Sequence, residues 1–385
     1  MLALMLLLVV PASTHLVAEQ RHPAAAAPAD SIVAALQPYV DHHTLAGAVT
    51  LVASGDKVLS LDAVGFADIA ANKPMRPDDL FWIASQSKPM TATALMLLVD
   101  EGKVNVDDPV EKYLPEFKGE WLKEKEDSEH MSLKRPAHPI TIRNLLTHTS
   151  GLPFSSPLEV PTLDVLPLAA RVRSYAMMPL DFEPDSKYQY SNAGMNTVGR
   201  ILEVVSGVPY EQFMEQRLFQ PLRMKDTTFW PSSRQLGRLA KSYKANAGKT
   251  GLEETKIDQL QYPLNDRDRQ PMPAGGLFST AADVARFCQM IMNGGTLDGK
   301  RYLSEAEVRQ MTTKQTPDAV PEQYGFGWST GNSEFGHGGA YATSMIIDPA
   351  HHLVFVWMVQ HASFPGDGEK SREAFMQAAR AEFAK

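Results

Sequence analysis

Cysteine is almost absent from this sequence, because Cys288 is the only one among 385 residues. A single thiol cannot form a disulfide within the chain, and it excludes a site in which several cysteine thiolates hold a metal. Histidines do not form a recognisable metal-binding motif either. The chain has no His-Glu-x-x-His, and its two His-His pairs fall at a predicted helix end (His42-His43) and in a predicted hairpin turn (His351-His352). We therefore expect no metal site and no cofactor.

An excess of positive charge is also missing. The chain has 37 lysines and arginines against 45 aspartates and glutamates, which argues against a nucleic-acid partner because such a partner requires a basic face. Beyond the N-terminus no apolar run approaches the roughly 20 residues of a membrane span, so we expect no transmembrane span in the mature chain. The Gly-x-Ser-x-Gly elbow of α/β-hydrolases does not occur either, which argues against that fold.

The N-terminus is apolar from Leu2 to Val10 and alanine-rich from Ala24 to Ala27. This pattern resembles a secretory signal peptide followed by a linker, so we predict that residues 1–28 are a leader and that the mature protein is periplasmic or secreted. The apolar part of this leader is short, and no lysine or arginine precedes it. A wrongly assigned start codon, or no signal at all, is the alternative.

Strand-like patterns lie near both ends of the chain, and helical patterns lie between them. Apolar runs around a polar turn predict an antiparallel hairpin from 49–53 and 58–64, and period-3.6 spacing predicts helices in the middle of the chain. The other predicted segments are helices at 31–42, 142–148, 192–206, 210–218, 282–292 and 371–383, strands at 327–330, 340–347 and 353–360, and a charged surface loop at 118–138.

This order of segments predicts an α/β (α+β) fold, in which an antiparallel β-sheet is flanked by helices and an all-helical domain is inserted. The predicted α/β domain combines 29–88 with 270–385, and the predicted helical domain is 89–269. A cleft between two such parts is a natural place for an active site.

Ser85-Gln86-Ser87-Lys88 lies between an apolar strand-like run, Phe81–Ala84, and a predicted helix from about Ser85 to Glu101. A serine hydroxyl needs a base or a positive charge within hydrogen-bond reach to become a nucleophile, and residues three apart on a helix share one face. The spacing therefore predicts a nucleophile, Ser85, activated by Lys88. The alternative is a helix cap followed by a solvated lysine. Ser54-Gly55-Asp56-Lys57 has the same spacing but is typical of a hairpin turn.

Two further motifs contain groups suited to catalysis. In Tyr190-Ser191-Asn192, a tyrosine whose pKa is lowered by a nearby ammonium can act as a general base, and the asparagine can hydrogen-bond both a lysine and a substrate amide. In His337-Gly338-Gly339, ahead of a predicted strand, the glycines let a substrate lie against the strand edge, where a free backbone N-H can stabilise an oxyanion. Taken alone, each motif also has a purely structural explanation. The first is then a tyrosine packed at a helix start, and the second is a glycine-rich turn.

Taken in order, Ser85-x-x-Lys88, Tyr190-x-Asn192 and His337-Gly338-Gly339 resemble the three motifs of the serine β-lactamase and penicillin-binding-protein superfamily, in which many members have Lys-Thr-Gly as the third. Three more stretches resemble the branch that contains class C β-lactamases, D-alanyl-D-alanine carboxypeptidases and family VIII carboxylesterases. They are ITIRNLLTHTSGLP at 140–153, AGGLFSTAAD at 274–283 and YGFGW at 324–328. The resemblance covers the chain from about Ser31 to Gln360.

The resemblance implies a β-lactamase/transpeptidase-like fold and a role for each motif. Ser85 would attack the substrate carbonyl, Lys88 would accept or relay its proton, and Tyr190 would pass that proton to the leaving group and later activate the hydrolytic water. The backbone N-H groups of Ser85 and Ala340 would form the oxyanion hole. Whether Lys88 or Tyr190 is the base in acylation stays open. The other substrate contacts would come from Asn192, His337, Gly338 and Gly339.

The third motif bears on the substrate. Lysine and threonine there would hold the carboxylate of a β-lactam or of a peptide ending in D-alanine, whereas His337 is expected to be only partly protonated at neutral pH and Gly338 has no hydroxyl. Loss of a charge-assisted hydrogen bond costs about 1.5–3 kcal/mol, so carboxylated substrates should bind less well. The first hypothesis is therefore a serine carboxylesterase that cleaves short-chain esters, with weak β-lactam hydrolysis as a side activity.

Two other hypotheses compete with it. One is a β-lactamase or a D-alanyl-D-alanine carboxypeptidase/D-aminopeptidase in which His337 holds the substrate carboxylate. The other is a non-catalytic peptidoglycan-binding protein that has kept the fold. The esterase hypothesis and the β-lactamase or peptidase hypothesis imply a small-molecule ester or amide as the partner of the site. The sequence does not indicate the oligomeric state.

Overall fold

The computed structural model describes residues 30–331 and 333–384, so the predicted leader at 1–28 lies outside the described residues. A seven-stranded antiparallel sheet with the strand order β12-β13-β14-β15-β1-β2-β3 forms its centre. The two ends of the chain meet where β1 (Gly47–Ala53) pairs with β15 (Leu353–Met358). One sheet is thus assembled from both ends of the chain, as the order of strand patterns predicted.

The remaining strands of the sheet continue outward from this central pair. β2 (Val58–Asp68) and β3 (Lys73–Pro74) extend it on the side of β1. On the side of β15 lie β14 (Ser344–Asp348), β13 (Phe335–Gly338) and β12 (Ser329–Thr330). Every residue of β1 and β15 is buried, because helices cover both faces at the centre of the sheet.

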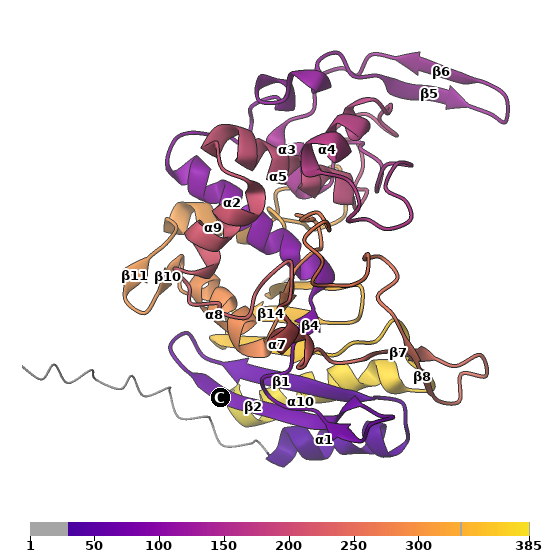
Figure 1. Cartoon of the computed structure of the whole chain (residues 1–385). Coiled ribbons are helices and arrows are strands. Elements are labelled where there is room, and N and C mark those ends of the chain that lie inside the picture. Colours follow the sequence, from indigo (N-terminus) through magenta and orange to yellow (C-terminus); the bar gives the residue numbers. More distant parts are fainter. Residues whose placement is uncertain (1–29, 332, 385) are drawn as a thin grey trace, which may run out of the picture.

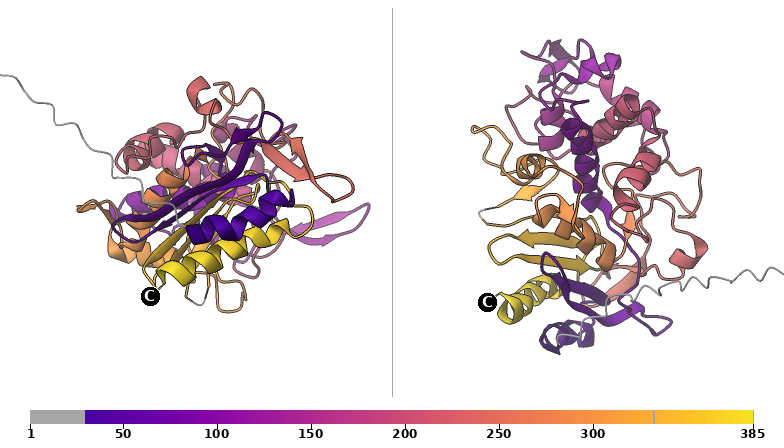
Figure 2. Two further views of the ribbon diagram at one scale, coloured as in Figure 1. Left: turned by 90° about the horizontal axis from the view of Figure 1, so that it is seen from below. Right: turned by 90° about the vertical axis from the view of Figure 1, so that its left-hand side faces the viewer.

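Helices α1 (Asp30–Asp41) and α10 (Ser371–Phe383) pack side by side on one face of the sheet, as Figure 2 shows from below. Helix α8 (Ala281–Met292) packs on the opposite face against β1 and β15. Alternate side chains of a strand point to opposite faces, so Phe355 and Trp357 join the core under α1 and α10, while their neighbours in β15 join the larger core on the other side.

The helical region lies above the sheet in Figure 1, and α2 (Ser87–Asp100) runs from the sheet into it. All residues of α2 up to Leu98 are buried, as expected for a helix that is surrounded on all sides. Against it packs α5 (Asn192–Ser206), which has the predicted bounds. The Ser191 hydroxyl caps the start of α5 by accepting a hydrogen bond from the N-H of Gly194, and its end has a glycine with a positive φ of 70°, Gly207.

The other elements are short. The helices are α3 (Ile142–Thr147), α4 (Leu168–Ala176), α6 (Tyr210–Met214), α7 (Ser233–Leu236) and α9 (Glu305–Thr312). The strand pairs are β4 (Phe81–Trp82) with β9 (Phe278–Ser279), β7 (Ser242–Ala245) with β8 (Leu252–Thr255), and β10 (Thr296–Leu297) with β11 (Lys300–Arg301). The predicted helix at 210–218 is α6 followed by a wider turn at Glu215–Phe219.

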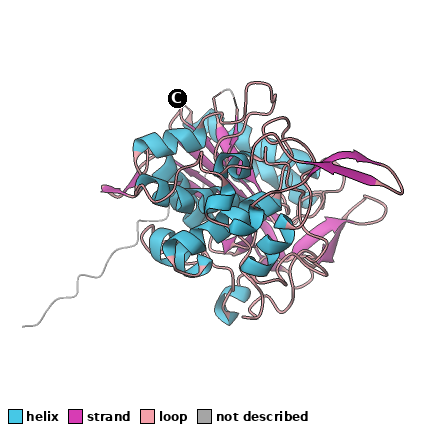
Figure 3. Cartoon of the chain, turned by 90° about the horizontal axis from the view of Figure 1, so that it is seen from above, coloured by secondary structure: helices cyan, strands magenta, loops and turns pink. Residues whose placement is uncertain are grey.

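The predicted surface loop at 118–138 is wrong, because it contains a hairpin of β5 (Leu122–Glu126) and β6 (Met131–Lys134). The hairpin projects from the helical region in Figures 1 and 3. All four residues of β6 and the last three of β5 are exposed, so most of the hairpin is not covered by other residues. The apolar alternation in β6 is limited to Met131 and Leu133 within a charged segment, which is too little to predict a strand. The predicted division of the chain into an α/β and a helical domain stays a prediction.

A second difference concerns the third motif. His337 and Gly338 belong to strand β13, and the predicted strand at 340–347 begins only at Ser344, after a turn that contains Ala340. Two glycines among the four residues of β13 explain the missed strand, because glycine is a poor strand former. The outcome for the site is that His337 is fixed by a ladder of hydrogen bonds with β14.

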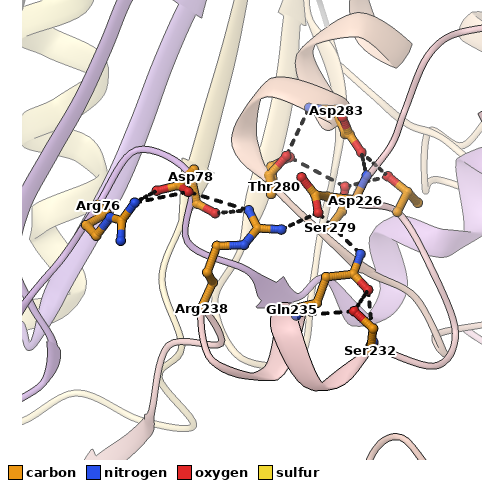
Figure 4. Close-up of polar contacts among 10 residues, drawn as sticks. Arg76, Asp78, Asp226, Ser232, Gln235, Arg238, Ser279, Thr280 and Asp283 are labelled. Carbon is orange, nitrogen blue, oxygen red and sulfur yellow. Dashed lines mark hydrogen bonds and ion pairs between the residues drawn. The ribbon is translucent and has the colours of Figure 1, made fainter.

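A polar joint ties the start of α8 to neighbouring segments (Figure 4). Arg238 forms ion pairs with Asp78, ahead of β4, and with Asp226. One carboxylate oxygen of Asp283 accepts hydrogen bonds from the N-H of Asp226 at 2.7 Å and from the hydroxyl of Thr227 at 3.0 Å. The end of the stretch at 274–283 therefore anchors α8.

Within the described ranges, no helix combines the length and the apolar character that crossing a membrane requires. The same residues include no cluster of three or more histidine, cysteine or acidic side chains arranged to hold a metal ion. Cys288 is fully buried in α8, where its sulfur lies 3.6 Å from the sulfur of Met345. It therefore acts as a small apolar side chain of the core.

Candidate active site

Ser85 is the one residue between Leu80 and Leu98 that is not buried. Strand β4 leads into a short turn at Ala84–Gln86 and then into α2, so Ser85 lies at the N-terminal end of that helix. Ala84 has a φ of 45°, which is uncommon for a residue other than glycine. The hydroxyl of Ser87 holds this turn by donating to the Ala84 carbonyl at 2.7 Å. A strained residue thus immediately precedes the predicted nucleophile.

The ammonium or amine of Lys88 lies at the centre of the site and is fully buried. Its Nζ is 3.1 Å from Oγ of Ser85, 2.8 Å from Oδ1 of Asn192 and 2.7 Å from the carbonyl oxygen of Ala274. Burial lowers the pKa of Lys88 well below its ordinary value. The structure therefore brings Ser85, Lys88 and Asn192 into direct contact and favours the neutral form of the lysine.

The partners of Lys88 indicate where the lone pair of the neutral amine points. A neutral amine has two N-H donors and one lone pair. Asn192 Oδ1 and the Ala274 carbonyl can only accept hydrogen bonds, so they take the two N-H groups. The lone pair is then directed toward the hydroxyl of Ser85, which is the arrangement of a nucleophile and its general base.

Tyr190 completes this group of side chains. Its hydroxyl interacts with the side chain of Ser85, and Nζ of Lys88 lies 4.5 Å from the centre of its ring. Burial raises the pKa of Tyr190, and the interaction with Ser85 opposes this rise only in part. A raised pKa is opposite to the direction that a tyrosine base requires, so Tyr190 is present as a neutral phenol.

His148 holds Tyr190 in place from both sides. Its carbonyl accepts a hydrogen bond from the N-H of Gln189 at 2.9 Å, and its Nδ1 accepts one from the N-H of Ser191 at 3.2 Å. The His148 ring also contacts the Tyr190 ring, with 4.6 Å between ring centres. The backbone of His148 has a φ of 61°, the left-handed conformation in which α3 ends.

The third motif lies beside the first, because β13 contacts the turn at Ala84–Gln86. The rings of His337 and Tyr190 are 6.1 Å apart. Gly339 is close to the backbone before Ser85: a Cβ atom at this position would come within 2.5 Å of the carbonyl oxygen of Ile83. Only a glycine lets the two segments approach this closely.

Both ring nitrogens of His337 are engaged. Nδ1 lies 2.7 Å from the carbonyl oxygen of Gly338, so it is the protonated nitrogen, and Nε2 accepts a hydrogen bond from the hydroxyl of Tyr324 at 2.9 Å. Burial and the nearby Lys88 lower the pKa of His337 to about 3. The expectation of a partly protonated histidine at neutral pH is therefore wrong, because the surroundings of the ring disfavour its charged form.

The two predicted oxyanion-hole donors have no partner of their own. Among residues 30–331 and 333–384, the backbone N-H groups of Ser85 and Ala340 donate to no protein acceptor, whereas the N-H of Gly339 donates to the carbonyl of Thr343. Ala340 is exposed and Ser85 is half-buried. Both groups are therefore available to a substrate oxygen.

Four residues with no role predicted from the sequence also contribute to the site, namely His148, Asn196, Ala274 and Tyr324. Three of them lie in the stretches at 140–153, 274–283 and 324–328, so their segments were recognised but not their contacts. Asn196 follows Asn192 by four residues, and this spacing, which places both on one face of a helix, was a signal available in the sequence.

A family model described as Beta-lactamase matches residues 32–380. Penicillin-binding protein 4 of Amycolatopsis lactamdurans is 30% identical over 311 residues, which are 78% of this chain and 76% of that protein. Esterase EstB of Burkholderia gladioli is 35% identical over 200 residues, which are 48% of this chain and 47% of that protein. The solved structure of EstCE1, a hydrolase with promiscuous acyltransferase activity, is 25% identical with a TM-score of 0.75, and the match covers 90% of this chain and 97% of EstCE1.

These similarities agree with the fold and with the order of the three motifs. The mixed architecture of a large antiparallel sheet flanked by helices is the β-lactamase/transpeptidase fold, which confirms the predicted fold class. The family match extends over most of the chain. The chain therefore belongs to the Beta-lactamase family, within a serine hydrolase superfamily whose members include esterases and penicillin-binding proteins.

Proposed function

We propose that this chain is a carboxylesterase that cleaves short-chain esters without a carboxylate, through an acyl-enzyme on Ser85. The observation that carries this proposal is the state of His337. With one ring nitrogen bonded to the Gly338 carbonyl and the other to Tyr324, the histidine offers neither a positive charge nor a free donor to a substrate. A carboxylate would lose its hydration there without gaining a charged partner, which is costly.

Acylation follows from the contacts of Lys88. The amine takes the proton of Ser85 while Oγ forms a bond to the ester carbonyl carbon, and the carbonyl electron pair moves to its oxygen. The N-H groups of Ser85 and Ala340 donate to this oxyanion. When the intermediate collapses, the bond to the alcohol oxygen breaks, this oxygen takes the proton of Tyr190, and the Lys88 ammonium returns a proton to Tyr190.

Deacylation uses the same groups in reverse. A water molecule attacks the acyl-enzyme carbonyl, its proton goes to Tyr190, and Tyr190 passes its own proton to the amine of Lys88. Collapse of the second intermediate breaks the bond to Ser85, whose oxygen takes the proton back from Lys88. The acid leaves, and all three side chains return to their starting states. Because Tyr190 keeps a raised pKa, it serves as a relay in both steps and never as a free phenolate.

A comparison of substrate classes tests the proposal. Rates on p-nitrophenyl acetate, butyrate and octanoate are measured beside the rate on nitrocefin, a β-lactam with a carboxylate, and Ser85→Ala is the matched control. We expect ester cleavage that exceeds nitrocefin cleavage and that is absent from the variant. Preferential cleavage of nitrocefin would overturn the proposed substrate class, and ester cleavage that survives in Ser85→Ala would overturn the proposed nucleophile.

A second candidate is a β-lactamase or a D-alanyl-D-alanine carboxypeptidase. The similarity to penicillin-binding protein 4 supports it, because that match covers more of the chain than the match to EstB. A peptide ending in D-alanyl-D-alanine is the probe that separates the two. Release of D-alanine at a rate comparable with ester cleavage would favour this candidate.

A further inference from the structure

Two asparagines of α5 act on Lys88 from the same side. Asn192 contacts the lysine directly, with its Oδ1 2.8 Å from Nζ. Asn196, one turn later, accepts a hydrogen bond from the N-H of Ala274 at 3.0 Å, and the carbonyl of Ala274 accepts from Nζ at 2.7 Å. One helix therefore sets both acceptors of the Lys88 N-H groups, the first by contact and the second through the backbone of one residue, Ala274.

The amide of Asn196 is itself oriented by a buried tyrosine. Its Nδ2 donates to the hydroxyl of Tyr175 at 2.9 Å, and that hydroxyl donates to Oε1 of Glu159, also at 2.9 Å. Because the Tyr175 hydroxyl uses its proton on Glu159, it can only accept from Asn196. This leaves Oδ1 of Asn196 as the acceptor for Ala274. Tyr175 and Asn196 have no exposed surface, so water does not compete for these bonds.

The segment around Ala274 is held at its other carbonyl groups as well. The Pro273 carbonyl accepts from the hydroxyl of Thr91 at 2.8 Å, and the Gly275 carbonyl accepts from the indole N-H of Trp82 at 2.7 Å. Upstream, the guanidinium of Arg171 donates to the Pro271 carbonyl at 3.3 Å and lies 3.5 Å from Glu159. The N-H and the carbonyl of Ala274 belong to two successive peptide groups: the N-H, which shares its group with the Pro273 carbonyl, is bound by Asn196, and the carbonyl binds the proposed base. The group of that carbonyl includes the N-H of Gly275, which donates to the Met272 carbonyl at 3.0 Å.

We propose that Asn196, oriented by Tyr175, is a positioning residue for Lys88. By fixing the backbone of Ala274 through its N-H, it gives the second N-H of the amine a stationary acceptor, so that the lone pair stays aimed at Ser85. Asn196 touches neither substrate nor the reacting atoms. The inference rests on the proposed function only in taking Lys88 as the base that activates Ser85.

Loss of this contact has two separate consequences. Without the bond to its N-H, the backbone of Ala274 is less firmly fixed and holds its carbonyl less firmly at Lys88, so the amine has fewer constraints and the rate at full deprotonation falls. A carbonyl oxygen also stabilises the ammonium form more than the amine, so its withdrawal lowers the pKa of Lys88 further. A residue that contributed only to stability would produce neither effect in the enzyme that remains folded.

The test follows the reactivity of Ser85 with a fluorophosphonate probe between pH 5 and pH 10. The variants are Asn196→Leu, which removes both hydrogen bonds at nearly constant size, and Tyr175→Phe, which removes only the orienting hydroxyl. The matched control is Thr197→Val, a fully buried position on the same helix whose hydroxyl donates to the Ala193 carbonyl. Rates are expressed per folded enzyme, from the fraction that near-UV circular dichroism reports as native.

For Asn196→Leu we expect a labelling rate at the alkaline plateau that is lower by about tenfold or more, since a well-placed general base contributes about 10²–10⁴-fold. We also expect the midpoint of the pH profile to move to lower pH. Tyr175→Phe should move it in the same direction by less, and Thr197→Val should leave it in place. A midpoint that is the same in Asn196→Leu and wild type would overturn the proposal, whatever the loss of stability.

Ester cleavage is recorded on the same samples, so that the two proposals fail separately. If wild type is labelled at Ser85 but does not cleave esters, the proposed function is wrong, while the pH midpoints still decide the role of Asn196. If wild type cleaves esters and the midpoint does not move, only the role of Asn196 is wrong.

Discussion

The hydroxyl of Tyr324 lies 2.9 Å from Nε2 of His337 and donates its proton to it. Tyr324 belongs to the stretch at 324–328 and is fully buried by its neighbours, and its ring packs on His148 with 4.8 Å between ring centres. The tyrosine therefore keeps His337 as a neutral acceptor at the first position of the third motif. The substrate preference proposed for the site depends on this pair.

Replacement of His337 by lysine should shift the preference toward carboxylated substrates. An ammonium at this place supplies the charge-assisted hydrogen bond that the imidazole lacks, and such a bond contributes about 1.5–3 kcal/mol. We expect the ratio of kcat/KM for nitrocefin to kcat/KM for p-nitrophenyl butyrate to rise by about tenfold or more in His337→Lys.

A neutral variant at the same position, His337→Gln, is the matched control. It retains a hydrogen-bonding side chain without a charge, so the ratio should stay within about threefold of wild type. An equal rise in both variants would mean that the loss of the Tyr324 contact, and not the new charge, admits the carboxylate.

Replacement of Lys88 by arginine should abolish activity despite the retained positive charge. A guanidinium does not lose its proton in proteins, so it has no lone pair for the proton of Ser85. We expect the pre-steady-state burst on p-nitrophenyl butyrate to slow by about 10²–10⁴-fold, the usual contribution of a general base. Lys88→Met gives the value for complete removal, and a Lys88→Arg rate within tenfold of wild type would contradict a role for Lys88 as base.

The fold and four of the side chains that meet in the site, Ser85, Lys88, Tyr190 and Asn192, were predictable from the sequence, because their motifs are local. Apolar runs around a polar turn locate β1 and β2, and the spacing of Ser85 and Lys88 on a helix places them together before any tertiary contact is known. Long elements with strong periodicity, such as α5, have the predicted bounds.

What the sequence did not reveal depends on contacts between distant segments. The neutral state of His337 requires the hydroxyl of Tyr324, and the position of the Lys88 amine requires the carbonyl of Ala274, 186 residues away. No residue pattern encodes a carbonyl oxygen, because every residue has one. The hairpin of β5 and β6 was missed for a different reason, since most of its residues are exposed and its apolar alternation is limited to Met131 and Leu133 in a charged segment.

Activity should rise with pH and then level off, since Lys88 acts in its neutral form. Burial lowers the pKa of Lys88, so the amine is present below the pH at which an ordinary lysine loses its proton. Activity is then lost as pH falls through this lowered pKa. His337, with a pKa of about 3, adds no step near neutral pH.

A profile of kcat/KM on p-nitrophenyl butyrate between pH 5 and pH 10 measures this rise of activity with pH, with the rate of Ser85→Ala subtracted at each pH. His337→Gln should show the same midpoint as wild type. A maximum near pH 5 would show that a protonated group is needed and would exclude Lys88 as the base.

Asp283, in the polar joint at the start of α8, should make the protein less stable as pH rises. Burial raises the pKa of this carboxyl to about 6, and the hydrogen bonds from Asp226 and Thr227 oppose the rise only in part. A folded-state pKa above the unfolded value of 3.8 means that the proton is bound more tightly in the folded protein. The associated stability is therefore fully present below about pH 4 and is lost as pH rises through about 6.

Asp283→Asn should remove this dependence, because an amide oxygen can accept the same two hydrogen bonds without a charge. We expect equal stability of variant and wild type at pH 4 and a more stable variant at pH 8, by at most about 3 kcal/mol for a pKa displaced by about two units. Urea unfolding at both pH values measures the difference, and the exposed Asp268→Asn is the control for loss of one negative charge. A variant less stable than wild type at pH 8 would mean that Asp283 is held in its charged form, and that its hydrogen bonds outweigh the cost of burial.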